Sequence, residues 1–189
     1  MVPGILCAVL LGAPGSGKGT QAERLSAALE VPAISTGELL RQAVAEGSEL
    51  GARVAQTMAA GLLVDDVLMG DVVRERLARP DTGRGFLLDG YPRTPEQARA
   101  LDEVLAAAGR RLDAVVMLDV PEEVLVARAL ARQRADDREA VVRERLRVYR
   151  EKTEPLVGLY ERRGLLRRID GDRPVEAITA SALAALGRS

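Results

Sequence analysis

The chain has 189 residues, 47% of them hydrophobic and 29% charged, a balance typical of one globular domain with a buried core. Its formal net charge of −1 gives no indication of nucleic acid or an anionic membrane as a partner. One cysteine and no histidine exclude a Cys/His zinc site, a disulfide framework and histidine-based acid–base catalysis.

The first eleven residues are apolar but lack the basic start of a signal peptide, and they continue into a glycine-rich loop. No apolar segment reaches membrane-spanning length, so we expect a cytoplasmic protein. Within this run, residues 5–11 (ILCAVLL) predict a buried strand, in which Cys7 is expected to be a small core residue.

Further apolar runs predict the other strands at 86–88, 114–118 and 165–169, with 31–34 as a weaker candidate. Helical spacing occurs between them, at 17–29, 37–46, 49–60, 65–79, 95–108, 121–132 and 137–163. Pro155 should kink or split the last helix, because proline lacks an N–H and clashes with the preceding turn. This alternation predicts an α/β fold, a parallel sheet of about five strands flanked by helices.

Two segments do not fit the alternation. Residues 35–64 contain two helical patterns without a strand between them, which predicts a small helical insert beside the sheet. Residues 131–137 (ARQRADD) form a short charged connection between two helices and are a candidate for a mobile flap.

A glycine-rich loop, GAPGSGKGT, lies at residues 12–20 between a predicted strand and a predicted helix. Such a loop directs backbone N–H groups at phosphate oxygens, and the helix N-terminus adds positive potential, so the segment predicts nucleotide binding. Lys18 would reach the terminal phosphates. The general pattern places a hydroxyl directly after the lysine, whereas here Gly19 intervenes before Thr20.

The extended form GAPGSGKGTQA resembles the nucleoside-monophosphate kinases, and the adenylate kinase family in particular. Four other features agree with this resemblance: ISTGELLR at 34–41, FLLDGYPRT at 86–94, Gln97, and RADD at 134–137. They extend over essentially the whole chain. The resemblance implies a P-loop NTPase-type fold with a core of residues 1–34, 65–130 and 138–189, an NMP-binding insert of 35–64, and a short lid of 131–137.

The family resemblance implies reversible phosphoryl transfer from ATP to AMP, giving two ADP, by a direct in-line step with closure of the insert and the lid. It implies Mg²⁺ as cofactor, no zinc because the seven-residue lid is the short kind, nucleotides as partners, and a monomer. This chemistry suits a histidine-free chain, because phosphoryl transfer depends on positioning and charge neutralisation and needs no nucleophilic side chain.

The resemblance also assigns roles to individual residues. The expected catalytic residues are Lys18, Asp89, Arg93, Arg128, Arg132, Arg134 and Arg145. The expected ATP-binding residues are Gly15, Ser16, Gly17, Lys18, Gly19, Thr20, Arg128, Arg132 and Arg173. The expected AMP-binding residues are Thr36, Arg41, Leu62, Leu63, Val64, Gly90, Tyr91, Pro92, Arg93, Gln97, Arg134 and Arg145.

Asp89 ends a predicted strand at the sheet edge where open α/β proteins bind ligands. A carboxylate there needs a partner, and the resemblance assigns it to Mg²⁺ through water. Four other arginines have no such motif position and are expected on solvated helix faces: Arg74, Arg99, Arg111 and Arg163.

Two alternatives remain open at this point. One is a UMP/CMP kinase, although Thr36 favours AMP because those relatives usually carry alanine there. The other is a nucleotide-binding regulatory module. A GTPase switch is not favoured, because the chain has no asparagine for an Asn-Lys-x-Asp guanine motif.

Overall fold

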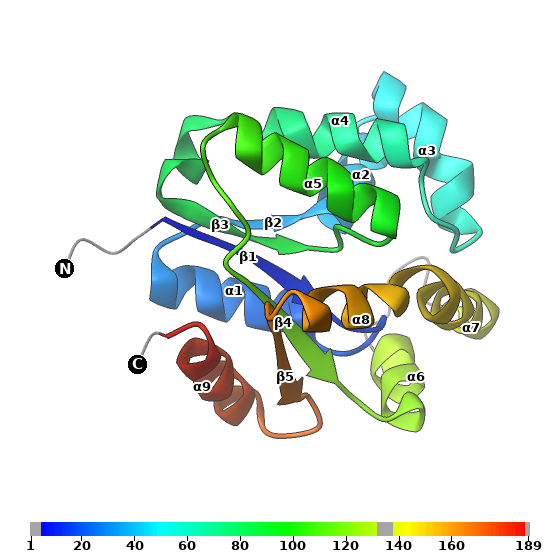
Figure 1. Ribbon diagram of the computed structural model, residues 1–189. Coiled ribbons are helices and arrows are strands. Elements are labelled where there is room, and N and C mark those ends of the chain that lie inside the picture. The colour runs from blue at the N-terminus through cyan, green and yellow to red at the C-terminus, as the bar shows by residue number, and fades with distance from the viewer. Residues whose placement is uncertain (1–4, 132–137, 188–189) are drawn as a thin grey trace.

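The computed structural model describes residues 5–131 and 138–187. Its sheet has five parallel strands in the order β2-β3-β1-β4-β5 (Figure 1). The strands are β1 (Leu6–Leu11), β2 (Ala33–Ser35), β3 (Gly85–Asp89), β4 (Ala114–Asp119) and β5 (Leu166–Asp170). The predicted α/β fold and all five predicted strands are therefore confirmed, with small shifts at the strand ends.

The predicted helices are also present, with small shifts at their ends. They are α1 (Lys18–Leu29), α2 (Thr36–Ala45), α3 (Glu49–Ala59), α4 (Asp66–Leu77), α5 (Pro95–Ala107), α6 (Glu122–Ala131), α7 (Glu139–Val148) and α8 (Pro155–Arg162). The long pattern before Arg163 is split as expected, because α8 begins at Pro155 and a π-helical segment, Tyr149–Thr153, joins it to α7. A short 3₁₀ helix, Pro80–Arg84, precedes β3.

One helix was not predicted, α9 (Val175–Ala185). Ile178 and Ala182 lie one turn apart and are buried against the sheet and α1. Five of the eleven residues in the helix are alanines, so its buried and exposed faces differ little in hydrophobicity. This low contrast explains why the sequence pattern did not separate the segment from a loop.

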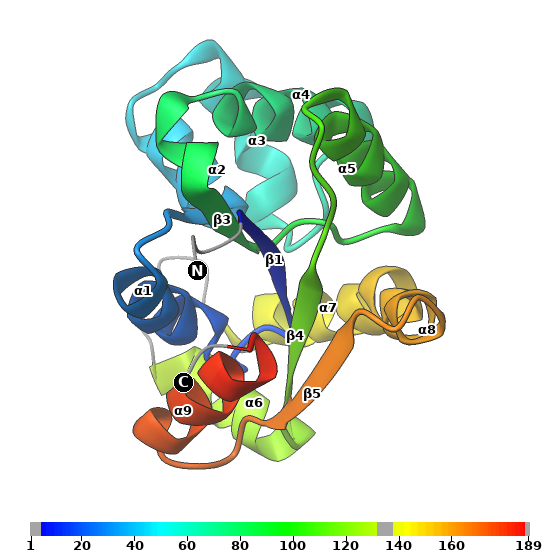
Figure 2. The ribbon, with the colours of Figure 1, turned by 60° about the vertical axis from the view of Figure 1, so that its left-hand side comes forward.

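Helices cover both faces of the sheet (Figure 2), and a cluster of buried hydrophobic side chains lies between the sheet and the helices on each side. Side chains alternate along β1, so Cys7 and Val9 pack toward α4, α5 and α8, whereas Ala8 and Leu10 pack toward α1 and α9. Cys7 is buried as expected, at 1% exposure. Because side chains on both of its faces are buried, β1 is held firmly in the centre of the sheet, and its carboxyl end continues into the glycine loop.

Helices α2 and α3 follow β2 without an intervening strand, as predicted for the insert, and lie at the end of the sheet toward which β1 and β3 run (Figure 1). Each helix begins at a serine cap: Ser35 Oγ accepts from the N–H of Glu38, and Ser48 Oγ accepts from the N–H of Gly51. At Gly51 the two helices are in backbone contact, since a Cβ there would lie 2.0 Å from the carbonyl oxygen of Ala43.

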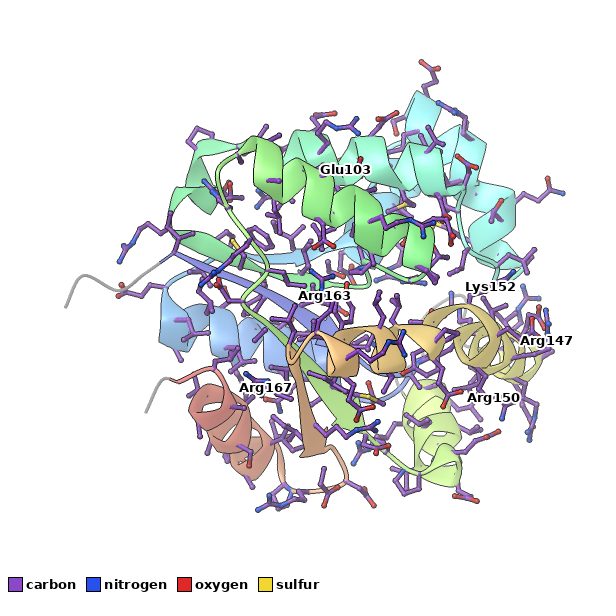
Figure 3. All side chains as sticks on the ribbon, viewed as in Figure 1. Glu103, Arg147, Arg150, Lys152, Arg163 and Arg167 are labelled. Carbon is purple, nitrogen blue, oxygen red and sulfur yellow. The ribbon has the colours of Figure 1, made fainter. Side chains whose placement is uncertain are left out.

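Arginines outside the predicted site form ion pairs on the surface, several of them labelled in Figure 3. Arg74, Arg99 and Arg111 have 61%, 69% and 91% exposed side chains, so all three are solvated as expected, but Arg111 lies in the loop between α5 and β4 and not on a helix. Arg163 is less exposed, because it makes two 2.9 Å bonds to Asp102 and lies over the Tyr160 ring, joining α8 to α5. In the part of the chain that the structure describes, no helix is long and apolar enough to span a membrane.

Candidate nucleotide-binding site

A cavity of about 850 Å³ opens at the carboxyl ends of β1, β2 and β3. This edge of a parallel sheet is where open α/β proteins bind ligands. The glycine loop forms one wall, and the opposite wall combines α2, the loop before α4 and the end of β3. Helix α7 contributes Arg145 to the same lining.

The cavity brings together most of the residues expected to bind nucleotides. Its lining includes Gly15, Gly17, Lys18, Gly19, Thr20, Thr36, Arg41, Leu62, Leu63, Val64, Asp89, Gly90, Pro92, Arg93, Gln97, Arg128 and Arg145. Ser16 and Tyr91 lie beneath the lining, 1% and 2% exposed, and Arg173 is exposed beside Ser181. Arg132 and Arg134 lie outside the described residues.

Backbone constraints at the glycine loop explain two of its glycines. Gly15 has φ +88°, and a Cβ there would lie 2.4 Å from the carbonyl oxygen of Leu125, so only glycine allows the loop to pass α6 this closely. Gly17 has φ +92° and precedes the first residue of α1, whose N-terminus therefore faces the loop. Lys18 Nζ donates to the carbonyl oxygens of Gly12 and Ala13, at 2.8 and 3.0 Å.

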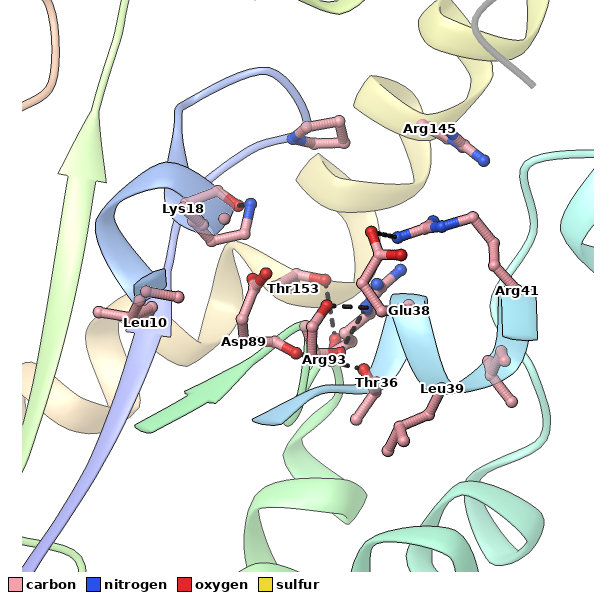
Figure 4. A pocket seen from close by; sticks show the side chains of 18 of the residues that line it. Leu10, Lys18, Thr36, Glu38, Leu39, Arg41, Asp89, Arg93, Arg145 and Thr153 are labelled. Carbon is pink, nitrogen blue, oxygen red and sulfur yellow. Dashed lines mark hydrogen bonds and ion pairs between the residues drawn. The ribbon is translucent and has the colours of Figure 1, made fainter. Parts of the chain in front are cut away.

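Three guanidinium groups lie close together on the wall opposite Lys18 (Figure 4). Arg93 is partly buried, and its Nε donates to the carbonyl oxygen of Gly90 at 2.7 Å. Burial lowers the pKa of Arg93, Asp89 raises it, and the charges of Arg145 and Arg41 lower it further. Because an arginine remains protonated even so, the group creates a strongly positive wall that suits a phosphate.

Hydrogen bonds hold the loop that carries Arg93. Gln97 Oε1 accepts from the Arg93 N–H at 2.7 Å, and Thr153 Oγ1 donates to the Arg93 carbonyl oxygen at 2.9 Å. Thr36 Oγ1 donates to the carbonyl oxygen of Asp89 at 3.4 Å. Sequence reasoning missed Thr153, which comes from the π-helical segment and is 5% exposed. A buried threonine in a helix carries no distinctive sequence signal.

Two more arginines of the cavity have partners in the chain. Arg41 Nη2 lies 2.5 Å from Glu38 Oε1, one turn earlier in α2. Arg128 donates to the carbonyl oxygen of Gly171 at 2.9 Å and to Asp172 Oδ1 at 3.0 Å. It thereby joins α6 to the loop after β5, which carries Arg173, one of the residues expected to bind ATP.

Asp89 is the carboxylate of the cavity that sequence analysis assigned to a metal. It lies at the end of β3, beside Leu10 of β1 and Ser35 of β2, and is partly exposed. Among the described residues, no group of three or more acidic, histidine or cysteine side chains is placed to hold a metal ion. One carboxylate facing a phosphate-binding loop fits Mg²⁺, which proteins hold through one or two carboxylates together with waters and substrate phosphates.

Comparison with known proteins agrees with this geometry. A family model described as adenylate kinase matches residues 10–165, a span that includes the glycine loop, Asp89 and the cavity arginines. The chain belongs to the adenylate kinase family. Members of this family are phosphotransferases, so the chain is an enzyme. The UMP/CMP kinase and the regulatory module are not favoured.

Relatives match nearly the whole chain. An adenylate kinase of Xanthomonas euvesicatoria is 51% identical over an alignment of 185 residues, with 95% of this chain and 98% of the relative covered. Adenylate kinase 1 of Synechocystis is 50% identical, with 92% of each chain covered. An adenylate kinase of Kosmotoga olearia is 44% identical, with 90% of this chain and 94% of the relative covered.

Proposed function

We propose that this enzyme transfers a phosphoryl group directly from ATP to AMP, giving two ADP, as a monomer and with Mg²⁺ but no zinc. The observation that carries the proposal is the composition of one cavity, in which a phosphate-binding loop with Lys18 faces a second group of cations, Arg41, Arg93 and Arg145. A protein that only binds ATP does not need this second cationic group. Two phosphate sites within one cavity fit transfer between two nucleotides.

On the donor side, the N–H groups of residues 15–20 would bind the ATP phosphates. Lys18 would exchange its two carbonyl partners for the terminal phosphates. Arg128, Arg132 and Arg173 would contact the rest of ATP, and Asp89 would hold Mg²⁺ through water. When bound, Mg²⁺ neutralises charge on the phosphates that Lys18 and the loop hold.

On the acceptor side, Arg41 and Arg93 would bind the AMP phosphate. The bond from Arg93 Nε to Gly90 fixes the guanidinium plane, which leaves its terminal nitrogens for a bidentate contact. Arg134 and Arg145 would neutralise the transferred phosphoryl group. The AMP base would lie against Thr36, Gln97, Leu62, Leu63 and Val64, near the turn Gly90-Tyr91-Pro92.

Closure of the insert (35–64) and the lid (131–137) over the core would exclude water from the transferred group. The loop before α4 is already close to α7, since a Cβ at Gly61 would lie 3.3 Å from Arg145 Cγ and from Val141 Cγ1. Movement of the insert therefore changes the distance between the acceptor pocket and Arg145. This coupling supports a mechanism in which acceptor binding completes the cationic site.

An acceptor panel tests the proposal. With ATP and Mg²⁺, we expect AMP to be phosphorylated faster than CMP or UMP, and Thr36→Ala to reduce this preference, because Thr36 is 1% exposed at the cavity wall. The measurement is kcat/KM for AMP, CMP and UMP with the wild-type enzyme and with Thr36→Ala. Equal or faster turnover of CMP or UMP by the wild-type enzyme would contradict the proposal.

A further inference from the structure

Asp66 is the first residue of α4, but it does not cap that helix. The cap is its neighbour Asp65, whose Oδ1 accepts from the N–H groups of Val67 and Leu68 at 3.0 and 3.1 Å. The Asp66 carboxylate instead turns to α5, where Oδ1 accepts from Gln97 Nε2 at 2.7 Å and Oδ2 accepts from Thr94 Oγ1 at 3.0 Å. Asp66 thus joins the end of the insert to the acceptor wall.

These contacts fix the orientation of the Gln97 amide. Its Oε1 accepts from the Arg93 N–H, and its Nε2 donates to Asp66 Oδ1, both at 2.7 Å. A backbone N–H can only donate and a carboxylate can only accept, so the reversed amide would place two donors together and two acceptors together. Gln97 is 2% exposed, so each such mismatch would leave a buried polar group without a hydrogen-bond partner.

The amide nevertheless keeps one donor and one acceptor for a ligand. Nε2 has a second hydrogen and Oε1 a second lone pair, and Gln97 lines the cavity. A 6-aminopurine presents an amine donor beside a ring-nitrogen acceptor, whereas a 6-oxopurine presents a carbonyl acceptor beside an N–H donor. An amide that can rotate by half a turn would pair with both bases. An amide held through both Oε1 and Nε2 presents its remaining donor and acceptor in one fixed arrangement, so it pairs with only one of the two bases.

We propose that Asp66 is a positioning residue that determines specificity: it fixes the Gln97 amide in the order that accepts a 6-aminopurine monophosphate and rejects a 6-oxopurine. The inference rests on the proposed function, because it requires that the base of the acceptor binds at Gln97. A site built to pair with specific donors and acceptors discriminates strongly, since the wrong base leaves buried polar groups unpaired.

The test compares AMP with IMP, a purine monophosphate that carries a 6-oxo group in place of the amine. Asp66→Ala should lower the ratio of kcat/KM for AMP to that for IMP by about tenfold, without changing the KM for ATP. Asp65→Ala is the matched control, because it removes the cap of the same helix without touching Gln97. An unchanged ratio in Asp66→Ala, or an equal fall in Asp65→Ala, would overturn the inference.

A nearly isosteric variant keeps the test informative if Asp66→Ala does not fold. Asp66→Asn preserves the packing, but its amide can present either an oxygen or an amine to Gln97, so the AMP/IMP ratio should fall here too. In a Gln97→Ala background, Asp66→Ala should no longer change the ratio. If Asp66→Ala still changes the AMP/IMP ratio in that background, Asp66 does not act through Gln97 and the inference is overturned. A wild-type enzyme that does not prefer AMP as acceptor would instead contradict the proposed function.

Discussion

Arg93 is a partly buried cation, and two further cations, Arg41 and Arg145, are among its charged neighbours. Its Nε donates to the carbonyl oxygen of Gly90, while burial and the charges of Arg145 and Arg41 lower its pKa and Asp89 raises it. A cation that is partly removed from water beside two others is held at an electrostatic cost, even though Asp89 faces Arg93 and Glu38 pairs with Arg41. A dianionic phosphate between the three guanidinium groups would relieve this repulsion. We therefore infer that the cationic site is already formed before the phosphate binds.

Replacing Arg93 tests this account. Arg93→Ala should lower the forward rate by about 10³-fold or more, as expected for arginines that neutralise phosphate in phosphoryl transfer. The measurement is ADP formation in a coupled assay, with thermal unfolding measured in parallel. Arg99→Ala is the control, because Arg99 is 69% exposed and pairs with Glu96 on the surface. Near-normal activity of Arg93→Ala would refute the role.

Helices, strands and loops could be predicted from the sequence where their backbone conformation depends on residues that are close together in the chain. The strand, loop and helix around Lys18 follow from an apolar run, glycines with positive φ and a helix N-terminus. The π-helical segment and Thr153 were not predictable, because their geometry depends on how α7 and α8 pack against the loop of Arg93. The pairing of Asp66 with Gln97 joins positions 31 residues apart, which no local pattern reveals.

Helix packing in the insert gives an element-scale prediction. Gly51→Ala should destabilise the protein and raise the KM for AMP more than that for ATP, because a Cβ 2.0 Å from the carbonyl oxygen of Ala43 must push α2 and α3 apart. The matched control is Gly70→Ala in the middle of α4, where a Cβ meets nothing within 4 Å. This control should stabilise the protein by about 0.5–1 kcal/mol. Thermal unfolding of Gly51→Ala and Gly70→Ala measures these effects. Equal stability of the two variants would contradict a close contact between α2 and α3 at Gly51.

For the whole molecule, buried titratable groups link stability to alkaline pH. Burial raises the pKa of Cys7 from 9.0 to about 11, and those of Tyr91 and Tyr149 from 10.0 to about 12. The unfolded chain therefore loses these protons at lower pH than the folded chain. Stability should be fully present below about pH 9 and fall between pH 9 and 12, by up to about 1.4 kcal/mol per pH unit for each group.

Urea unfolding across this pH range measures the effect. Tyr149→Phe removes a buried hydroxyl that has no hydrogen-bond partner within the described residues, so it should cost little at neutral pH and make the alkaline fall less steep. Stability that stays constant up to pH 11 would show that these groups titrate alike in the folded and unfolded chains.

In the proposed reaction, one cavity holds donor and acceptor together and transfers the phosphoryl group between them without releasing it to water. The most direct test follows ATP, AMP, ADP and inorganic phosphate in a single reaction by ³¹P NMR. We expect ATP and AMP to disappear in equal amounts, two ADP to form for each pair, and no inorganic phosphate to be released. Phosphate release at a comparable rate, or ATP consumption without loss of AMP, would contradict it.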